Sequence, residues 1–105
     1  MNLSQDAWAA QLKQDEHAVI LDVRTEDECS DGIIPGALII DVHKGQGFIY
    51  RLEVLDKNKS YYVYCKAGSR SEMACAIMKQ MGFTTTYNLE GGFLNWEGDV
   101  TVPEL

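Results

Sequence analysis

Long apolar runs, an excess of positive charge and a cysteine-rich framework are all missing from this 105-residue chain. No apolar run approaches the roughly 20 residues that a membrane-spanning helix needs. The chain has 9 basic and 16 acidic residues and a formal net charge of −7, so no broad positive field attracts nucleic acid or an anionic membrane. We therefore expect neither as a partner, and any anion that the protein handles must be held by a local device.

Cysteine is scarce, with three residues and therefore an odd count. Cys29, Cys65 and Cys75 form neither a disulfide framework nor the paired spacing of a zinc site. His17 and His43 have no partners at metal-ligand spacing, so we expect both on the surface, with no metal ion and no cofactor. The chain begins without a basic stretch before an apolar run, which is not the pattern of a signal peptide. Free thiols without an export signal predict a location in the reducing cytoplasm.

The alternation of predicted elements indicates an α/β fold. The length predicts one domain over residues 1–105. Short apolar or β-branched runs predict buried strands at 19–23, 38–40, 61–64 and 84–87. Capped or amphipathic segments predict helices from Ser4 onward, at 24–30, 46–55 and 69–80, and a short one ending near Trp96. Strands alternating with helices predict a mostly parallel sheet. Sites in such sheets lie beyond the carboxyl ends of the strands, which directs attention to the loops after Val23, Ile40, Cys65 and Leu89.

The segment from Ser69 to Gln80 has the strongest helix signal in the chain. Ser69 followed by Glu72 predicts a capping box, and Gly82 is placed to end the helix. The apolar positions predict one buried stripe, formed by Met73, Ala74, Ile77, Met78 and Met81. In the first helix, the residues expected to face the core are Ala7, Trp8 and Leu12.

A reactive-cysteine pattern joins the strand at 61–64 to this helix. Cys65 ends the strand and small residues follow at 67–69, and such a loop can turn successive backbone N–H groups inward to form an anion-binding nest. The helix N-terminus and the charges of Lys66 and Arg70 also favour thiolate over thiol. We therefore expect a Cys65 pKa below the free value of about 8.5. From the residues alone, the alternative is a buried strand-end cysteine that only packs.

The length of this loop separates two chemistries. Cysteine-dependent phosphatases place five residues between the cysteine and the arginine, which accommodates a phosphoryl group. Here four residues separate Cys65 from Arg70, and Ser71 occupies the position of the phosphatase arginine. The shorter loop encloses less space and suits one additional sulfur atom better, so a phosphatase or an arsenate reductase is disfavoured.

Four motifs, in order along the chain, resemble the rhodanese (thiosulfate sulfurtransferase) homology family in its single-domain form. They are LDVR at 21–24, GIIPGA at 32–37, YCKAGSRS at 64–71, and LEGG at 89–92 followed by Trp96, and the resemblance covers about residues 12–98. It implies a rhodanese-like α/β fold, with a central five-stranded parallel sheet and helices on both faces. It also implies a persulfide on Cys65, cradled by the active-site loop of Lys66, Ala67, Gly68, Ser69 and Arg70.

Several residues of these motifs have two interpretations. Lys66 either binds the sulfonate end of thiosulfate or is solvated, and Arg70 either contacts substrate or braces neighbouring loops. We expect the remaining motif residues to support the walls of the site: Asp22, Arg24, Glu90, Gly91 and Gly92. Ile33 and Cys29 replace the family's usual histidine and aromatic residue.

The two other cysteines are expected to have packing roles. Cys29 is expected to fill space in the core, with a resolving thiol as the alternative. Cys75 lies on the flank of the predicted helix stripe, where we expect it to be partly buried. It is too far along the helix from Ser69 for a disulfide with Cys65 to form.

The resemblance implies an enzyme, a thiosulfate sulfurtransferase that works by double displacement. The Cys65 thiolate takes a sulfane sulfur from thiosulfate or a related small anionic donor, and a thiophilic acceptor such as a thiol, a protein or cyanide then removes it. A cysteine that is already ionised needs no general base. The alternative is a rhodanese-like sulfur-relay or binding module with little activity on free thiosulfate. Production of thiocyanate from thiosulfate and cyanide distinguishes the two.

Overall fold

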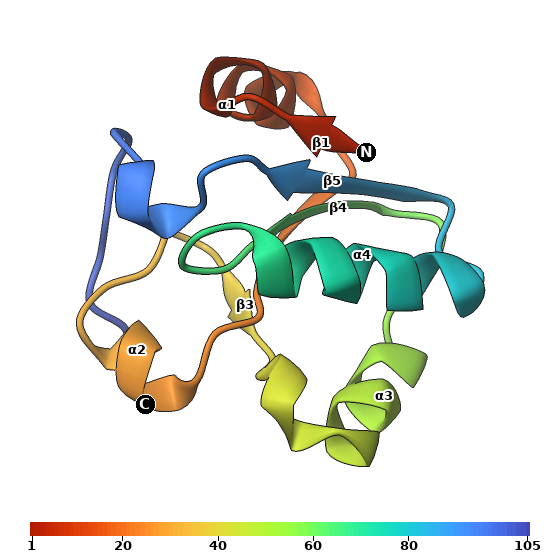
Figure 1. Cartoon of the computed structure of the whole chain (residues 1–105). Helices are drawn as coiled ribbons and strands as arrows, with labels where there is room; N and C mark the ends of the chain where they lie inside the picture. Colours follow the sequence, from red (N-terminus) through yellow and green to blue (C-terminus); the bar gives the residue numbers. More distant parts are fainter.

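The central feature of the fold is a five-stranded sheet in which every strand pair is parallel. The computed structural model describes residues 1–105 (Figure 1). The strands lie in the spatial order β1-β5-β4-β2-β3, and their bounds are β1 Asn2–Leu3, β2 Ala18–Asp22, β3 Leu38–Ile39, β4 Ser60–Tyr64 and β5 Thr85–Leu89. Because all the strands run the same way, their carboxyl ends meet at one edge of the sheet.

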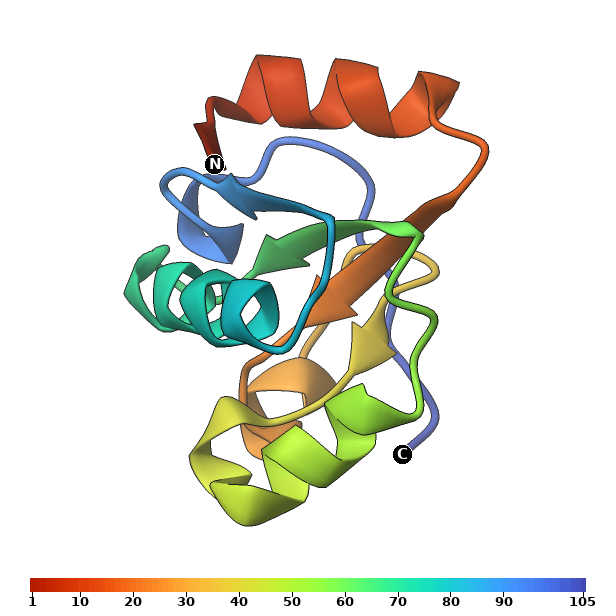
Figure 2. The same ribbon diagram turned by 90° about the vertical axis from the view of Figure 1, so that its right-hand side faces the viewer.

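Helices cover both faces of this sheet (Figure 2). Helix α1, Gln5–Gln14, packs on one face, while α3, Gln46–Glu53, and α4, Ser69–Gln80, pack on the other. Short helices follow the carboxyl ends of the strands: α2 Glu26–Ser30, η1 Val42–Lys44 and η2 Phe93–Asn95. The parallel sheet with helices on both faces that the resemblance implies is therefore confirmed. Every helix is too short or too polar to span a bilayer.

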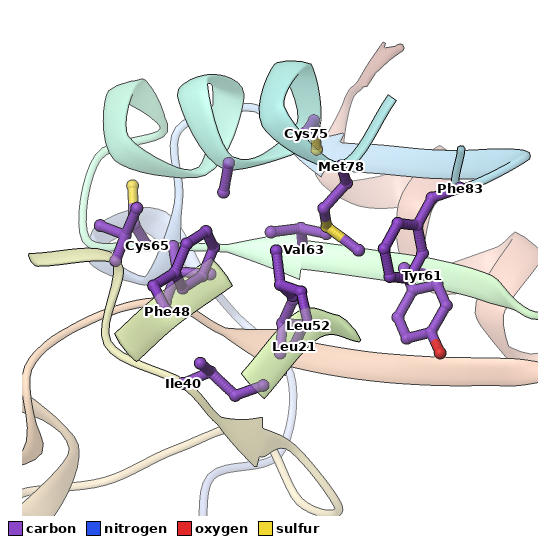
Figure 3. Packing of buried hydrophobic residues seen from close by; sticks show 13 residues of the cluster. Leu21, Ile40, Phe48, Leu52, Tyr61, Val63, Cys65, Cys75, Met78 and Phe83 are labelled. Carbon is purple, nitrogen blue, oxygen red and sulfur yellow. The ribbon is translucent and has the colours of Figure 1, made fainter. Parts of the chain in front are cut away.

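Strand β4 divides its side chains between two hydrophobic clusters, as the period of two in a strand requires. Tyr61, Val63 and Cys65 point into the larger cluster, between the sheet and helices α3 and α4 (Figure 3). Tyr62 and Tyr64 point into the smaller one, beside Trp8 of α1. Cys65 therefore continues the core-facing alternation of β4 and arrives at the start of α4.

Helix α4 spans the predicted residues, but its first turn and its buried face differ from the prediction. Gly68, not Ser69, is the N-cap, with φ of 109° and no side-chain cap, so the predicted capping box does not form. Met73 is 51% exposed, and the buried face consists of Ser71, Ala74, Cys75 and Met78. The loop sets the rotation of the helix, and it turns a polar residue, Ser71, toward the sheet in place of Met73.

The remaining differences are small. Ala7 is exposed, whereas Trp8 beside it is completely buried. Cys75 is only 6% exposed, which is deeper than its expected place on the helix flank. Strand β1 has two residues, which is too short to leave a pattern in the sequence.

Candidate active site

The candidate site is the loop that joins β4 to α4, at the carboxyl edge of the sheet. Cys65 is 1% exposed, and its Sγ points toward the loop in front of α4 (Figure 3). The backbone N–H of Gly68 donates to Sγ at 3.0 Å. The Ser71 hydroxyl lies 3.3 Å from the same sulfur. Hydrogen-bond donors therefore face the Cys65 sulfur, and its surroundings are not purely apolar.

The loop is held in this form from outside by the residues that follow β5. The N–H groups of Phe93 and Leu94 donate to the carbonyls of Cys65 and Lys66 at 2.8 Å and 2.9 Å. In a trans peptide the carbonyl and the next N–H point in opposite directions, and the chain has no cis bonds. Anchoring these two carbonyls therefore turns the N–H groups of Lys66 and Ala67 away from η2, which is the arrangement of an anion nest.

The donors around the sulfur change the acidity of Cys65. Burial raises its pKa. The hydrogen bonds from the Ser71 hydroxyl and from the N–H groups of Ser71, Gly68 and Ala67 lower the pKa by more than burial raises it, so the pKa lies below the ordinary value of 9.0. This is the direction that the sequence predicts. Burial instead raises the pKa of Cys75, and it raises that of Cys29 to about 12. Cys65 is thus the cysteine whose surroundings favour the thiolate.

Arg70 is engaged by an acidic residue from another element. Its guanidinium makes a two-pronged pair with the Glu28 carboxylate of α2, at 2.7 Å and 2.8 Å. The hydrogen bond from Arg70 is the main cause that lowers the pKa of Glu28 to about 2. Glu28 is itself fixed by a capping box with Thr25. The geometry therefore matches the interpretation in which Arg70 braces neighbouring loops, and its charge is balanced locally.

Lys66 and Ser69 are the exposed polar side chains of the loop. Lys66 takes part in none of the ion pairs of the structure, so its charge is free to act on an approaching anion. On the β5 side, the loop borders a polar hollow lined by Asn2, Ala67, Gly68, Ser69, Glu72, Asn88, Glu90 and Gly91. Glu90 and Gly91 therefore line this hollow beside the loop.

Asp22 and Arg24 form a buried pair at the end of β2 that makes no hydrogen bond to the sulfur. Arg24 donates to the Asp22 carboxylate at 2.7 Å and to the Gly32 carbonyl at 2.8 Å. Its guanidinium also lies 4.3 Å from the centre of the Phe93 ring. Since the N–H of Phe93 anchors the Cys65 carbonyl, the Asp22–Arg24 pair supports the active-site loop indirectly, by packing against the Phe93 ring. Cys29 is completely buried next to this pair, which fits packing.

Gly92, which the sequence places in a neighbouring wall, packs directly against the active-site loop. It is buried with φ of 62°, a conformation that side chains with a Cβ rarely adopt. A Cβ atom there would overlap the Lys66 carbonyl and lie 2.7 Å from the Cys65 carbonyl oxygen. Glycine is required because the backbone after β5 must lie directly against the active-site loop.

Two residues of the site were not predicted from the sequence, Ser71 and Asn88. Both are almost fully buried, at 0% and 3% exposure. The Ser71 hydroxyl bonds to the Asn88 Oδ1, and the Asn88 Nδ2 donates to the Gly68 carbonyl at 3.2 Å. Ser71 ends the YCKAGSRS motif, but nothing in the sequence assigns a role to its hydroxyl or marks Asn88 as its partner.

No metal centre forms from the histidine, cysteine and carboxylate residues. No group of three such side chains is placed to hold a metal ion. His17 and His43 are both exposed, and His43 lies 3.2 Å from the Asp41 carboxylate.

Comparison with known proteins identifies the family of this chain. Residues 5–99 match the model of the rhodanese-like domain, and the chain belongs to the rhodanese-like family. It is 38% identical to YtwF of Bacillus subtilis, which carries a sulfurtransferase name, over 92% of this chain and 90% of that protein. It is 35% identical to the thiosulfate sulfurtransferase GlpE of Coxiella burnetii, over 88% and 81% of the two chains.

Two further similarities extend this picture. YrkF of Bacillus subtilis, which carries a sulfur-carrier name, is 34% identical over 91% of this chain but only 50% of its own length. Among solved structures, a rhodanese-like domain protein from Staphylococcus aureus superposes with a TM-score of 0.83 at 28% identity, covering 98% of each chain. Proteins with sulfurtransferase names are thus similar in sequence to this chain over most of its length.

Proposed function

We propose that this protein is a single-domain sulfurtransferase that carries a sulfane sulfur as a persulfide on Cys65 and accepts it from thiosulfate or a related donor. The observation that carries the proposal is the Cys65 sulfur itself, which receives the Gly68 N–H at 3.0 Å and faces the Ser71 hydroxyl at 3.3 Å. These donors stabilise a thiolate, and the thiolate is the nucleophilic form of cysteine.

The reaction consists of two displacements on sulfur. In loading, the Cys65 thiolate attacks the outer sulfur of thiosulfate, the bond between the two thiosulfate sulfurs breaks, and sulfite leaves with its electron pair. In discharge, an acceptor such as cyanide or a thiolate attacks the terminal sulfur, and the electron pair of the S–S bond returns to Cys65. Covalent catalysis of this type gives ping-pong kinetics.

The loop favours the loaded state electrostatically. A persulfide at neutral pH carries its negative charge on the terminal sulfur, and the inward N–H groups of the loop are fixed before the reaction begins. Donors that are held in position need no reorganisation as the charge moves, which is the basis of oxyanion-hole catalysis. Lys66 adds the one unpaired positive charge of the loop.

A sulfur relay is the second candidate, and the charge of the chain favours it. With a net charge of −7, the protein repels a free dianion at long range, and one lysine offsets this only locally. One relative, YrkF, carries a sulfur-carrier name. In this case a partner protein delivers or receives the sulfur, and turnover on free thiosulfate is negligible.

For both candidates we propose a location in the cytoplasm, where the three free cysteines stay reduced.

The experiment that tests the proposal is intact-mass measurement after incubation with thiosulfate. The expected result is a gain of one sulfur atom that dithiothreitol removes, followed by thiocyanate formation when cyanide is added. Sulfur gain without steady-state thiocyanate production supports the relay. Absence of any gain, from thiosulfate or from a persulfide donor, overturns both.

Lys66→Ala is expected to raise the KM for thiosulfate several-fold while changing kcat less. The charge of Lys66 attracts the dianion in the ground state and in the transition state alike, and a loss of such uniform binding appears in KM. The difference should shrink with added salt, because exposed charges are screened over about 10 Å at 0.1 M ionic strength. Lys79→Ala, at the exposed far end of α4, is the matched control. An effect confined to kcat and insensitive to salt contradicts this role.

A further inference from the structure

The hydroxyl of Ser71 has more acceptors than it has protons. A serine hydroxyl donates one hydrogen, yet three acceptors surround this one in the buried space beneath the loop. They are the Cys65 Sγ at 3.3 Å, the Gly68 carbonyl at 3.1 Å and the Asn88 Oδ1, which is the closest of the three. The position of the single proton therefore depends on the relative strength of these acceptors.

The Gly68 carbonyl is already occupied by other donors. It accepts the N–H of Glu72 at 3.1 Å, within the first turn of α4, and the Nδ2 of Asn88 at 3.2 Å. A carbonyl oxygen has two lone pairs, and these two donors use both. The proton of Ser71 is thus left with two acceptors, the sulfur of Cys65 and the side-chain oxygen of Asn88.

The orientation of the Asn88 amide is fixed by a chain of side chains that ends at a carboxylate. The Asn88 Nδ2 donates to the Asn2 Oδ1 at 3.0 Å, and the Asn2 Nδ2 donates to the Glu72 carboxylate at 3.2 Å. An ionised carboxylate only accepts, so Asn2 must present its Nδ2 to it and its Oδ1 to Asn88. Asn88 in turn must present its Oδ1 to Ser71, which makes Asn88 a true competitor for the proton.

We propose that the Ser71 proton moves between Asn88 and the Cys65 sulfur as the charge on that sulfur changes, and that Ser71 thereby assists release of the transferred sulfur. This inference rests on the proposed persulfide chemistry. When Cys65 is a thiolate, Sγ is the stronger, charged acceptor and takes the hydrogen bond. When Cys65 is a persulfide, Sγ is a neutral bridging atom, and the proton turns to the Asn88 oxygen.

The consequence is an asymmetry between the two half-reactions. In discharge, the acceptor's electron pair forms a bond to the terminal sulfur, the S–S bond breaks, and its electron pair returns to Sγ, where charge develops beside the Ser71 hydroxyl. A leaving thiolate of lower pKa departs faster. In loading, the same hydrogen bond must weaken as Sγ loses its charge, so it gives no acceleration to that step. Ser71 is therefore a catalytic residue of discharge, and Asn88 is a positioning residue.

The first test is Ser71→Ala, with the two half-reactions measured separately. Loading is followed by intact mass after mixing with thiosulfate, and discharge is followed by thiocyanate release from preloaded protein. Both are measured at a pH above the Cys65 pKa, which is determined by alkylation. Discharge is expected to slow about fivefold to tenfold, because a hydrogen bond to a developing charge is lost. Loading per thiolate is expected to be unchanged or faster, and the alkylation pKa is expected to rise.

Three further variants separate this role from a structural one. Ser71→Thr retains the hydroxyl and should restore the wild-type ratio of the two rates. Asn88→Ala removes the acceptor that holds the Ser71 proton when the sulfur is uncharged, so the Cys65 pKa should fall and discharge should quicken, opposite to the changes in Ser71→Ala. Ser30→Ala, at an exposed serine of α2, is the control, and thermal unfolding is recorded for all.

Equal slowing of loading and discharge in Ser71→Ala, or an unchanged discharge rate, overturns the proposal. So does an Asn88→Ala protein that is folded and shows an unchanged or raised pKa or an unchanged or slower discharge. Should Ser71→Ala fail to fold, the Asn88→Ala result decides the question. Alkylation measures the Cys65 pKa without any sulfur transfer. If the wild-type protein takes up no sulfur but the pKa still rises in Ser71→Ala, the proposed function is refuted, while the hydrogen bond from Ser71 to the thiolate is supported.

Discussion

Cys65→Ser is expected to abolish sulfur transfer, with kcat reduced by roughly a thousandfold or more, while the protein stays folded. The serine hydroxyl is similar in size to the thiol and fits the same donors, but it is not ionised at neutral pH. The N–H of Gly68 that donates to Sγ would then face a neutral oxygen that cannot attack a sulfur atom. Thiocyanate formation and intact mass after thiosulfate measure the loss.

The matched controls are the other two cysteines. Cys75 lies on the buried face of α4, about one turn beyond Ser71, and Cys29 lies beside the Asp22 carboxylate. Cys75→Ser and Cys29→Ser are both expected to retain most of the activity, because burial raises the pKa values of these thiols and their side-chain partners are Thr86 and Asp22, outside the loop. Near-normal turnover in Cys65→Ser, or a loss as large in either control, would remove Cys65 from the centre of the mechanism.

The layout of the fold could be predicted because it depends on local patterns. The runs Val19–Leu21 and Tyr61–Tyr64 are apolar and β-prone, and both lie in central strands. A strand followed by a glycine-containing loop and a helix also places Cys65 correctly, since this arrangement is local in sequence. The direction of its pKa shift follows from the same local donors.

The fine geometry of the loop could not be predicted from local rules. A serine at position 69 with a glutamate at 72 matches the capping-box pattern, yet Gly68 takes the N-cap position. Two long-range bonds, from Phe93 and Leu94 to the carbonyls of the loop, help to set its path and hence where the helix begins. The rotation of α4 follows, and it exposes Met73 while burying Ser71.

The partners of the charged residues also depend on tertiary contacts. Arg70 and Glu28 are 42 positions apart, and nothing in either segment indicates the other. The role of Arg70 therefore stayed open between substrate contact and bracing until the ion pair was seen. The same applies to Ser71 and Asn88, which are 17 positions apart and meet because α4 packs beside β5.

Gly92→Ala is expected to be the most destabilising single-methyl change in the site. A Cβ atom at this position would overlap the Lys66 carbonyl, and both partners are backbone atoms that cannot rotate away. Backbone strain at φ of 62° is expected to lower the free energy of unfolding by about 1–3 kcal/mol. Forced overpacking is expected to lower it by about 1–3 kcal/mol more. Chemical denaturation measures the sum.

Gly45→Ala isolates the contribution of strain. Gly45 has a similar φ of 56°, but an added Cβ would meet nothing within 4 Å. This variant should lose only the strain energy and should keep its sulfur transfer, because Gly45 caps α3 and its carbonyl bonds only to Phe48 and Ile49.

The folded fraction of Gly92→Ala should also transfer sulfur poorly. The overlap pushes the Cys65 loop away from η2, and a displacement of about 1 Å in a catalytic group can cost roughly a hundredfold in rate. Loading is therefore expected to fall at least tenfold after correction for the unfolded fraction. If Gly92→Ala instead matches Gly45→Ala in both stability and loading rate, the close approach of η2 is not what shapes the nest. The bonds from Phe93 and Leu94 would then be a consequence of the loop conformation and not its cause.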